Sequence, residues 1–160
     1  LILLQLCTAC SETTYHSNEE IGRAFQRHKS TFENVAVSAV GENSGYIHKP
    51  DAEGQETECG DSGCKLMEAD GLHIHLQREM SDTELRHIAE AALALMENVD
   101  IESISFSQEA VRFHLKDESE YSWDPTIVYW RADDADEGKI GYGEAVCRLA
   151  DHWYAALITR

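Results

Sequence analysis

The chain has 160 residues, 42% of them hydrophobic, which is enough for one domain with a packed core. Its 30 acidic residues outnumber the 13 basic ones and give a formal net charge of −17. Such a surface repels phosphate backbones and anionic lipid headgroups, so we expect no nucleic-acid partner and no electrostatic binding to membranes. A protein partner would be basic or neutral, although acidity that only maintains solubility is the commoner explanation.

The first ten residues, LILLQLCTAC, are an apolar run that ends in small residues and a cysteine, and a polar segment follows. Spanning a bilayer takes about 20 apolar residues, whereas a signal-peptide core takes about 7–15. The pattern is typical of the start of an exported bacterial lipoprotein. We therefore expect residues 1–9 to be the remnant of a signal peptide and residues 10–16 to be a tether. A buried first strand or the apolar start of a helix is the alternative.

Cys10 is the expected site of lipidation. Thr8 and Ala9 are the small residues that a lipobox places before the modified cysteine, although Cys7 stands where such a motif usually has Leu. Cleavage after Ala9 by an ordinary signal peptidase fits the same residues. The sequence therefore predicts a location in the bacterial cell envelope, either lipid-anchored to the membrane or periplasmic.

Residues 17–160 are expected to form a single domain that begins with a helix. Ser17 and Glu20 have the spacing of a capping box. A stripe of apolar residues at helical spacing follows as far as about Ala39, formed by Ile21, Phe25, Phe32 and Ala36. Residues 41–63 hold five of the ten glycines and several acidic residues. They predict a long exposed loop, which is the natural place for a functional insertion.

Two cysteines lie at the end of this loop. Cys59 and Cys64 flank a short Gly-rich turn, and we expect them to form a disulfide in an oxidising compartment. Closing so small a loop stabilises the fold by about 2 kcal/mol at best. A zinc site could begin with the same spacing, but the second cysteine pair that it needs is missing. Cys147 is left over, either as a buried thiol or as a competing partner for one of these two.

A strand and a second helix are predicted next. Residues 72–76 alternate between apolar side chains and histidines, as in a half-buried strand. Ser81 and Glu84 form another capping box. The clearest helical stripe of the chain follows and ends near Asn98.

After residue 100 the hydrophobic period changes to two, which indicates strands. Strands are predicted at 104–106, 111–115 and 126–131, with a polar connection over 117–125 and an acidic turn over 133–138. Residues 144–149 and 153–158 predict a final hairpin, or a strand and a short helix. The expected fold class is α+β, with two helices packed on one face of an antiparallel β-meander of about four to six strands.

Spaced aromatic residues mark the helices and strands. They lie in Phe25-x-x-His28-x-x-x-Phe32-Glu33, Ile104-x-Phe106, Ile127-x-Tyr129 and the segment from Arg148-Leu149 to Trp153-Tyr154. This set resembles a group of small bacterial lipoproteins that close with a Trp-Tyr pair in the final strand. The resemblance covers most of the chain after residue 9 and implies an α+β protein of the cell envelope. It implies no activity and no catalytic residues.

His73 and His75 are the candidate metal ligands, because their spacing places both imidazoles on one face of a strand. A third ligand would come from elsewhere, and His114 projects from the polar face of its own strand. The commoner explanation is that the two histidines form the solvent side of a half-buried strand. No cofactor is expected.

Two further patterns carry weaker chemistry. Ser62 lies in GDSG, which resembles the nucleophile segment of chymotrypsin-like proteases, but those enzymes also need a base, a carboxylate and an oxyanion hole. No other part of the chain matches, and a disulfide-closed turn explains the segment better. Trp123 lies beside Glu120 and Asp124 in a polar segment, where the ring could stack on a sugar, although packing is the commoner role of aromatic residues.

An acidic run before Gly138 matches a calcium-binding loop in part. Counting from Asp133, the glycine falls at the expected sixth position, but Ala135 occupies the third, where a ligand is needed. A solvated acidic turn is the favoured interpretation.

Together these patterns predict a non-enzymatic, lipid-anchored cell-envelope protein that acts by binding a protein or ligand. A specific form of this hypothesis is an acidic inhibitor or immunity-type protein that blocks a basic envelope protein, because opposite charges speed encounter. Trp123, the acidic strand connections and the 41–63 loop would form the contact surface. The alternative is a small envelope hydrolase or metal-dependent enzyme that uses Ser62, or His73 and His75.

Overall fold

A computed structural model describes residues 17–39, 44–50, 65–69, 71–77, 80–116, 123–134, 136–141 and 146–159. They form an α+β domain built on one antiparallel sheet, which confirms the predicted fold class. The helices are α1 (Asn18–Ser38), α2 (Asp82–Met96) and the short α3 (Glu137–Ile140). The strands are β1 (Gly45–His48), β2 (Lys65–Ala69), β3 (Leu72–Leu76), β4 (Ile101–Phe106), β5 (Ala110–Leu115), β6 (Trp123–Trp130), β7 (Val146–Ala150) and β8 (Trp153–Thr159).

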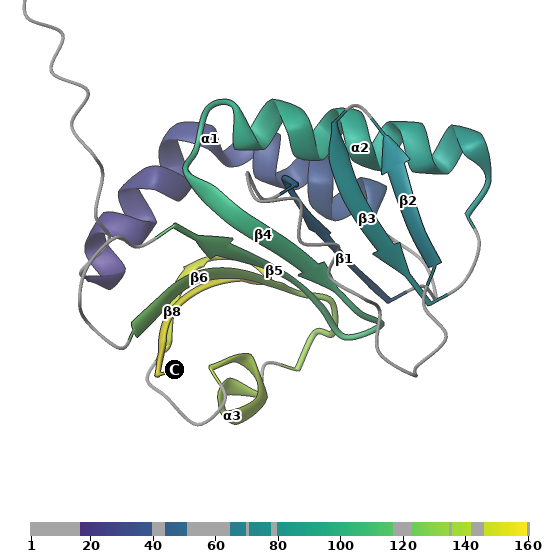
Figure 1. The fold of residues 1–160 in the computed structure, drawn as a ribbon. Coiled ribbons are helices and arrows are strands. Elements are labelled where there is room, and N and C mark those ends of the chain that lie inside the picture. Colours follow the sequence, from purple (N-terminus) through teal and green to yellow (C-terminus); the bar gives the residue numbers. More distant parts are fainter. Residues whose placement is uncertain are drawn as a thin grey trace, which may run out of the picture.

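The sheet has the strand order β2-β3-β1-β4-β5-β6-β8-β7, and every neighbouring pair is antiparallel. The two long helices, α1 and α2, pack against each other and cover one face of the sheet, whereas α3 lies on the other side (Figure 1). Chain order and sheet order agree from β4 to β6, but β1 is inserted between β3 and β4. The connection from β3 through α2 to β4 therefore crosses over β1.

Both long helices begin at the predicted capping residues. At α1, Ser17 Oγ accepts a hydrogen bond from the backbone amide of Glu20 at 3.3 Å. At α2 the capping box is complete, since Ser81 Oγ accepts from the amide of Glu84 at 3.3 Å and the Glu84 carboxylate accepts from the amide of Ser81 at 3.0 Å. These contacts satisfy amides of the first turn that have no partner within the helix.

Four aromatic rings in the core connect the first helix to the sheet. Phe32 of α1 meets Phe113 of β5 edge-on with ring centroids 5.0 Å apart. Trp153 of β8 lies 4.9 Å from Phe25 and 5.9 Å from Phe113. Aromatic pairs at this spacing add about 0.5–1.5 kcal/mol each beyond the area that they bury. The first helix is therefore packed directly against the last strand.

A second, smaller hydrophobic cluster lies on the opposite face of the sheet. It contains Ala110, Val128, Trp130, Ile140 and Tyr154. Ile140 comes from α3 and the others from β5, β6 and β8, so α3 covers this end of the face that α1 and α2 leave uncovered (Figure 1).

The strand count differs from the prediction, because the described residues form eight strands rather than four to six, and α3 is a third helix. β1 lies inside 41–63, where the sequence predicts only a loop. Of its four residues only Ile47 belongs to the hydrophobic core, so a period of two cannot be recognised. β2 is a five-residue edge strand, whose backbone pairing needs no apolar pattern.

The C-terminal segment forms the hairpin rather than the strand and short helix. β6 begins at Trp123 instead of Thr126, because β8 is long enough to pair with Trp123, Asp124 and Pro125 beyond the end of β5. The prediction of a buried Cys147 is wrong. Its thiol is free and exposed, since β7 is an edge strand with no neighbour on its outer side.

Candidate functional site

Histidines from three strands lie on the sheet face that α1 and α2 do not cover. On β3, the side chains of Leu72, Ile74 and Leu76 lie in the core, so the alternating His73 and His75 lie on the opposite face. We call the side chains of Tyr46, His48, His73, His75 and His114 the histidine face.

The pairing of β1 with β3 creates the centre of the histidine face. In this register His48 is opposite His73, and Tyr46 is opposite His75. The Nε2 atoms of His48 and His75 are 3.1 Å apart, and their rings are nearly parallel with centroids separated by 5.2 Å. Both side chains are buried. The sequence therefore predicted the pair on β3 but missed its third member on β1.

His73 differs from the other two because it faces a carboxylate. Its Nε2 lies 3.5 Å from the exposed carboxylate of Glu68 on β2, and its ring meets that of His48 edge-on at 5.4 Å. His73 and Glu68 also help to line a cavity of about 330 Å³ at this end of β2 and β3, together with Pro50, Ala69, Gly71 and Leu72. The edge of the histidine face is thus open to small solutes.

Burial favours the neutral form of two of these histidines. It lowers the pKa of His75 below its usual value, and the charges of His48 and His73 lower it further. Burial also lowers the pKa of His114, against which the charge of Asp124 acts. His114 Nε2 lies 3.2 Å from Ser105 Oγ, a distance at which the two share a hydrogen bond. A neutral imidazole can bind a metal ion or accept a proton.

A second candidate surface is an acidic end of the sheet. The turn at 107–109, the segment at 131–134 and the turn at 151–152 all lie at this end, because Ala110 pairs with Trp130 and Tyr129 pairs with Trp153. We define the acidic end by six exposed side chains: Glu109, Asp133, Asp134, Asp136, Glu137 and Asp151.

Backbone hydrogen bonds connect the three turns of the acidic end. The amide of Trp130 donates to the carbonyl of His152 at 2.7 Å, and the amide of Arg131 donates to the carbonyl of Glu109 at 2.9 Å. His152 itself adopts a left-handed conformation (φ 63°), which closes the two-residue turn between β7 and β8. The carboxylates are therefore presented from a fixed backbone.

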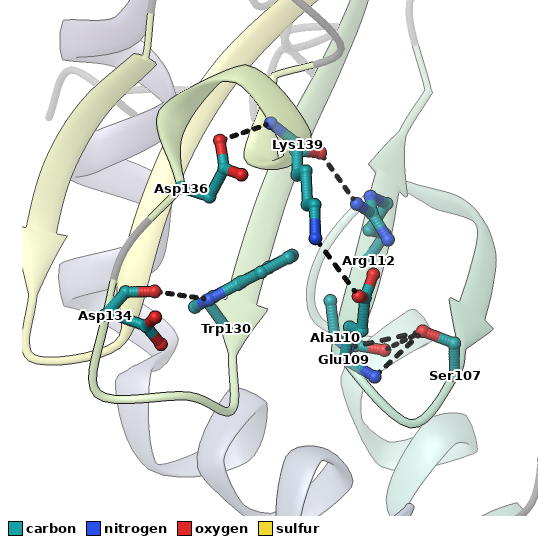
Figure 2. Close-up of polar contacts among 8 residues, drawn as sticks. All are labelled: Ser107, Glu109, Ala110, Arg112, Trp130, Asp134, Asp136 and Lys139. Carbon is teal, nitrogen blue, oxygen red and sulfur yellow. Dashed lines mark hydrogen bonds and ion pairs between the residues drawn. The ribbon is translucent and has the colours of Figure 1, made fainter.

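Side-chain contacts also connect α3 with β5 and with the turn at 107–109, and β6 with the segment at 131–134 (Figure 2). The indole Nε1 of Trp130 donates to the carbonyl of Asp134 at 3.1 Å, and Asp136 Oδ1 caps α3 by accepting from the amide of Lys139 at 3.2 Å. Arg112 donates to the carbonyl of Lys139 at 3.1 Å, and Lys139 Nζ lies 3.6 Å from the Glu109 carboxylate. The acidic run before Gly138 thus has a structural role in starting α3.

Some of the predicted site residues belong to parts of the chain outside the described ranges. Cys10, Cys59, Ser62, Cys64 and Glu120 lie outside the described residues. Trp123 is the first residue of β6, but its side chain also lies outside the described part, whereas Asp124 is half-buried near His114. The grouping of Trp123, Glu120 and Asp124 as one site therefore stays a prediction, as does the disulfide between Cys59 and Cys64.

Within the described ranges, no group of three or more His, Cys, Asp or Glu side chains is already arranged to hold a metal ion. Among the described residues, none of the helices combines the length and the apolar composition that a membrane-spanning helix requires. Comparisons of the chain with protein-family models, curated proteins and solved structures found no match. Any assignment of function therefore depends on the residues themselves.

One sequence signal could have indicated His48. The triplets Tyr46-Ile47-His48 and His73-Ile74-His75 each place an isoleucine between two ring side chains. In a strand each isoleucine lies on one face and the two rings on the other, and rings of neighbouring strands can then pair across the sheet. The signal is short, and it lies in a segment whose glycines and acidic residues favour a loop.

Proposed function

We propose that this chain is a non-enzymatic, lipid-anchored protein of the bacterial cell envelope that binds a basic protein through its acidic end. The observation that carries the proposal is the convergence of six exposed carboxylates, four from the three turns and two, Asp136 and Glu137, from the start of α3. Three basic side chains lie among them, Arg131, Lys139 and Arg148, of which Lys139 and Arg148 pair with Glu109 and Asp151. The surplus of negative charge remains.

Physical reasoning supports such a surface as a binding site. A net charge of −17 attracts a cationic partner over distances near the Debye length of about 8–10 Å and raises the association rate. Because hydrogen bonds connect the turns, little backbone entropy is lost when a partner binds. An acidic inhibitor or immunity-type protein needs both properties, fast encounter and a fixed contact surface.

The location in the envelope is supported by the first ten residues, whose apolar run and small residues precede Cys10. The expected chain from residue 10 to residue 16 would separate the domain from the lipid. Intact mass of the protein extracted from bacterial membranes tests this part directly. A mass increase corresponding to an acylated Cys10 supports it, whereas an unmodified thiol at Cys10 contradicts it.

The binding part is tested with an extract of the bacterial envelope passed over immobilised protein at low and high salt. We expect a basic protein to be retained at low salt and released at high salt. The variant with Asp133→Asn, Asp134→Asn and Asp151→Asn should associate about tenfold more slowly. A matched control neutralises three exposed acids elsewhere, Glu90→Gln, Glu97→Gln and Glu102→Gln.

The control removes the same charge from other places, so it separates a specific surface from general acidity. Retention that survives both high salt and the triple Asn variant would contradict the proposal, as would equal losses in the two variants. Absence of any retained protein would contradict it as well.

The enzymatic alternative is tested separately. A serine-reactive phosphonate probe should leave the protein unlabelled, since a serine hydrolase would need an activated serine. Ser105 contacts His114, which could act as its base, and Ser62 is the serine that the sequence indicates. Labelling that disappears in Ser105→Ala or Ser62→Ala would establish the alternative.

A further inference from the structure

Three imidazoles from two neighbouring strands meet on the histidine face. They are not part of the acidic end, so the proposed function gives them no role. His48 and His75 contact each other through their Nε2 atoms, and His73 lies against the ring of His48. Each of these side chains lies on the face opposite the core residues of its own strand. The cluster therefore has a composition that hydrophobic packing does not explain.

The proton positions follow from the backbone. His48 Nδ1 lies 2.7 Å from the carbonyl oxygen of Lys49, and a carbonyl only accepts hydrogen bonds, so Nδ1 carries the proton. In the neutral imidazole, His48 Nε2 then holds a lone pair. That lone pair is directed at His75 Nε2, 3.1 Å away, which donates its proton to it.

This arrangement is the one that metal-binding histidines adopt. Such histidines bind through one ring nitrogen while the other donates to a carbonyl or carboxylate, which fixes the ring and the tautomer. His48 has this carbonyl in Lys49. Two nitrogens bound to one tetrahedral ion at about 2.0–2.1 Å lie about 3.3 Å apart, close to the 3.1 Å between the two Nε2 atoms.

We propose that His48 and His75 chelate one late first-row divalent transition-metal ion, with His73 as the third ligand. Zn²⁺, Ni²⁺ and Cu²⁺ all accept imidazole nitrogen. Binding requires the proton of His75 to move from Nε2 to Nδ1. The lone pair of His75 Nε2 then faces the ion, and no proton is released to the solvent. The inference goes beyond the proposed function and does not depend on the location of the protein or on the acidic end.

His73 must rotate to complete the site. In the structure its Nε2 is directed at the Glu68 carboxylate at 3.5 Å, which is why no three ligands are already in place among the described residues. Glu68 is exposed and loses little when this contact breaks. The adjoining cavity of about 330 Å³, which His73 lines, gives the ion and its remaining water molecules access from solvent.

The electrostatic environment favours a cation. The net charge of −17 raises the local concentration of divalent cations around the chain.

The test is calorimetric titration of the metal-stripped, full-length protein with Zn²⁺ and Ni²⁺, after removal of any purification tag. We expect one ion per chain. His48→Gln and His75→Gln should each raise the dissociation constant at least about tenfold, the lower end of what a supporting residue alone costs. His114→Gln lies on the same face and serves as the matched control, with affinity unchanged.

A second measurement keeps the proposal independent of folding defects. Ring-nitrogen resonances of His48, His73 and His75 in the unmodified protein should shift on addition of Zn²⁺, whereas those of His114 should not. Absence of binding, retained affinity in both His48→Gln and His75→Gln, or an equal loss in His114→Gln would each overturn the proposal. So would resonances of His48 and His75 that do not move.

Discussion

Gly45 is the position where a single methyl group tests the placement of β1. A Cβ at Gly45 would lie 2.5 Å from Phe106 Cζ and 2.6 Å from the carbonyl oxygen of His75. Ordinary contacts begin near 3.4 Å, so the methyl group is about 0.8 Å too close to the carbonyl. The tip of the Phe106 ring can move, but the carbonyl belongs to β3 and cannot move without separating the two strands.

Gly45→Ala should therefore destabilise the fold strongly. Overpacking of this kind costs about 1–3 kcal/mol, and each weakened backbone hydrogen bond adds about 1 kcal/mol, so we expect about 2–4 kcal/mol. For a chain of this size the midpoint of thermal unfolding falls about 2–4 °C per kcal/mol, which gives about 5–15 °C. Circular dichroism during heating and in denaturant measures both quantities.

Gly71→Ala is the matched control, because a Cβ there has no atom within 4 Å. Its backbone has φ +76°, a left-handed conformation that disfavours residues with a Cβ. The substitution should therefore lower the free energy of unfolding by only about 1 kcal/mol. If Gly45→Ala unfolds no more easily than Gly71→Ala, the insertion of β1 between β3 and β4 is wrong. The contact between His48 and His75 would then lose its basis as well.

Three other substitutions test different parts of the fold. Ser81→Ala removes the hydroxyl that accepts from the Glu84 amide at the start of α2, while the backbone amide of residue 81 can still donate to the Glu84 carboxylate. The loss should cost about 1 kcal/mol, and an unchanged midpoint of thermal unfolding would contradict this. Phe113→Ala removes a fully buried ring and should cost about 3–5 kcal/mol in denaturant titration, so a loss below about 1 kcal/mol would exclude the aromatic core described above. Burial lowers the pKa of His114 in the folded chain, with Asp124 opposing and Arg112 reinforcing the shift, so the unfolded chain binds the proton more tightly. The stability from this residue is therefore complete above about pH 7.5 and declines as the pH falls through about 6.5, and His114→Gln should make the free energy of unfolding less dependent on pH between 8 and 5. A pH profile identical to that of the unmodified protein would show that His114 does not titrate with folding.

Elements with a local signal could be predicted from the sequence. α2 has a capping box and a stripe with the helical period, and both act within one segment. β5 alternates strictly from Val111 to Leu115, with Val111, Phe113 and Leu115 in the core. Elements that depend on distant partners could not be predicted. β1 pairs through its backbone with strands that follow later in the chain, and it contributes only Ile47 to the core.

The same distinction holds for the candidate sites. Alternation along one strand placed His73 and His75 on a common face, but the register between two strands decides that His48 joins them. The acidic end was visible in part as the acidic turn at 133–138, whereas Glu109 and Asp151 reach it only through sheet pairing. The prediction that Cys147 is buried was wrong because its neighbours in sequence do not reveal that β7 forms the edge of the sheet.

The inserted position of β1 also bears on the order in which the molecule folds. His48 is 25 residues from His73 and 55 residues from Ser103, its two cross-strand neighbours, whereas β4 and β5 are separated by a short turn. Closing longer loops costs more chain entropy, so the β4–β5 hairpin can nucleate early and β1 enters the sheet late. Pulse-labelled hydrogen exchange should find the amides of β5 protected before those of β1. The three imidazoles would then come together in one of the final steps of folding, and a chain arrested before that step would lack them as a cluster.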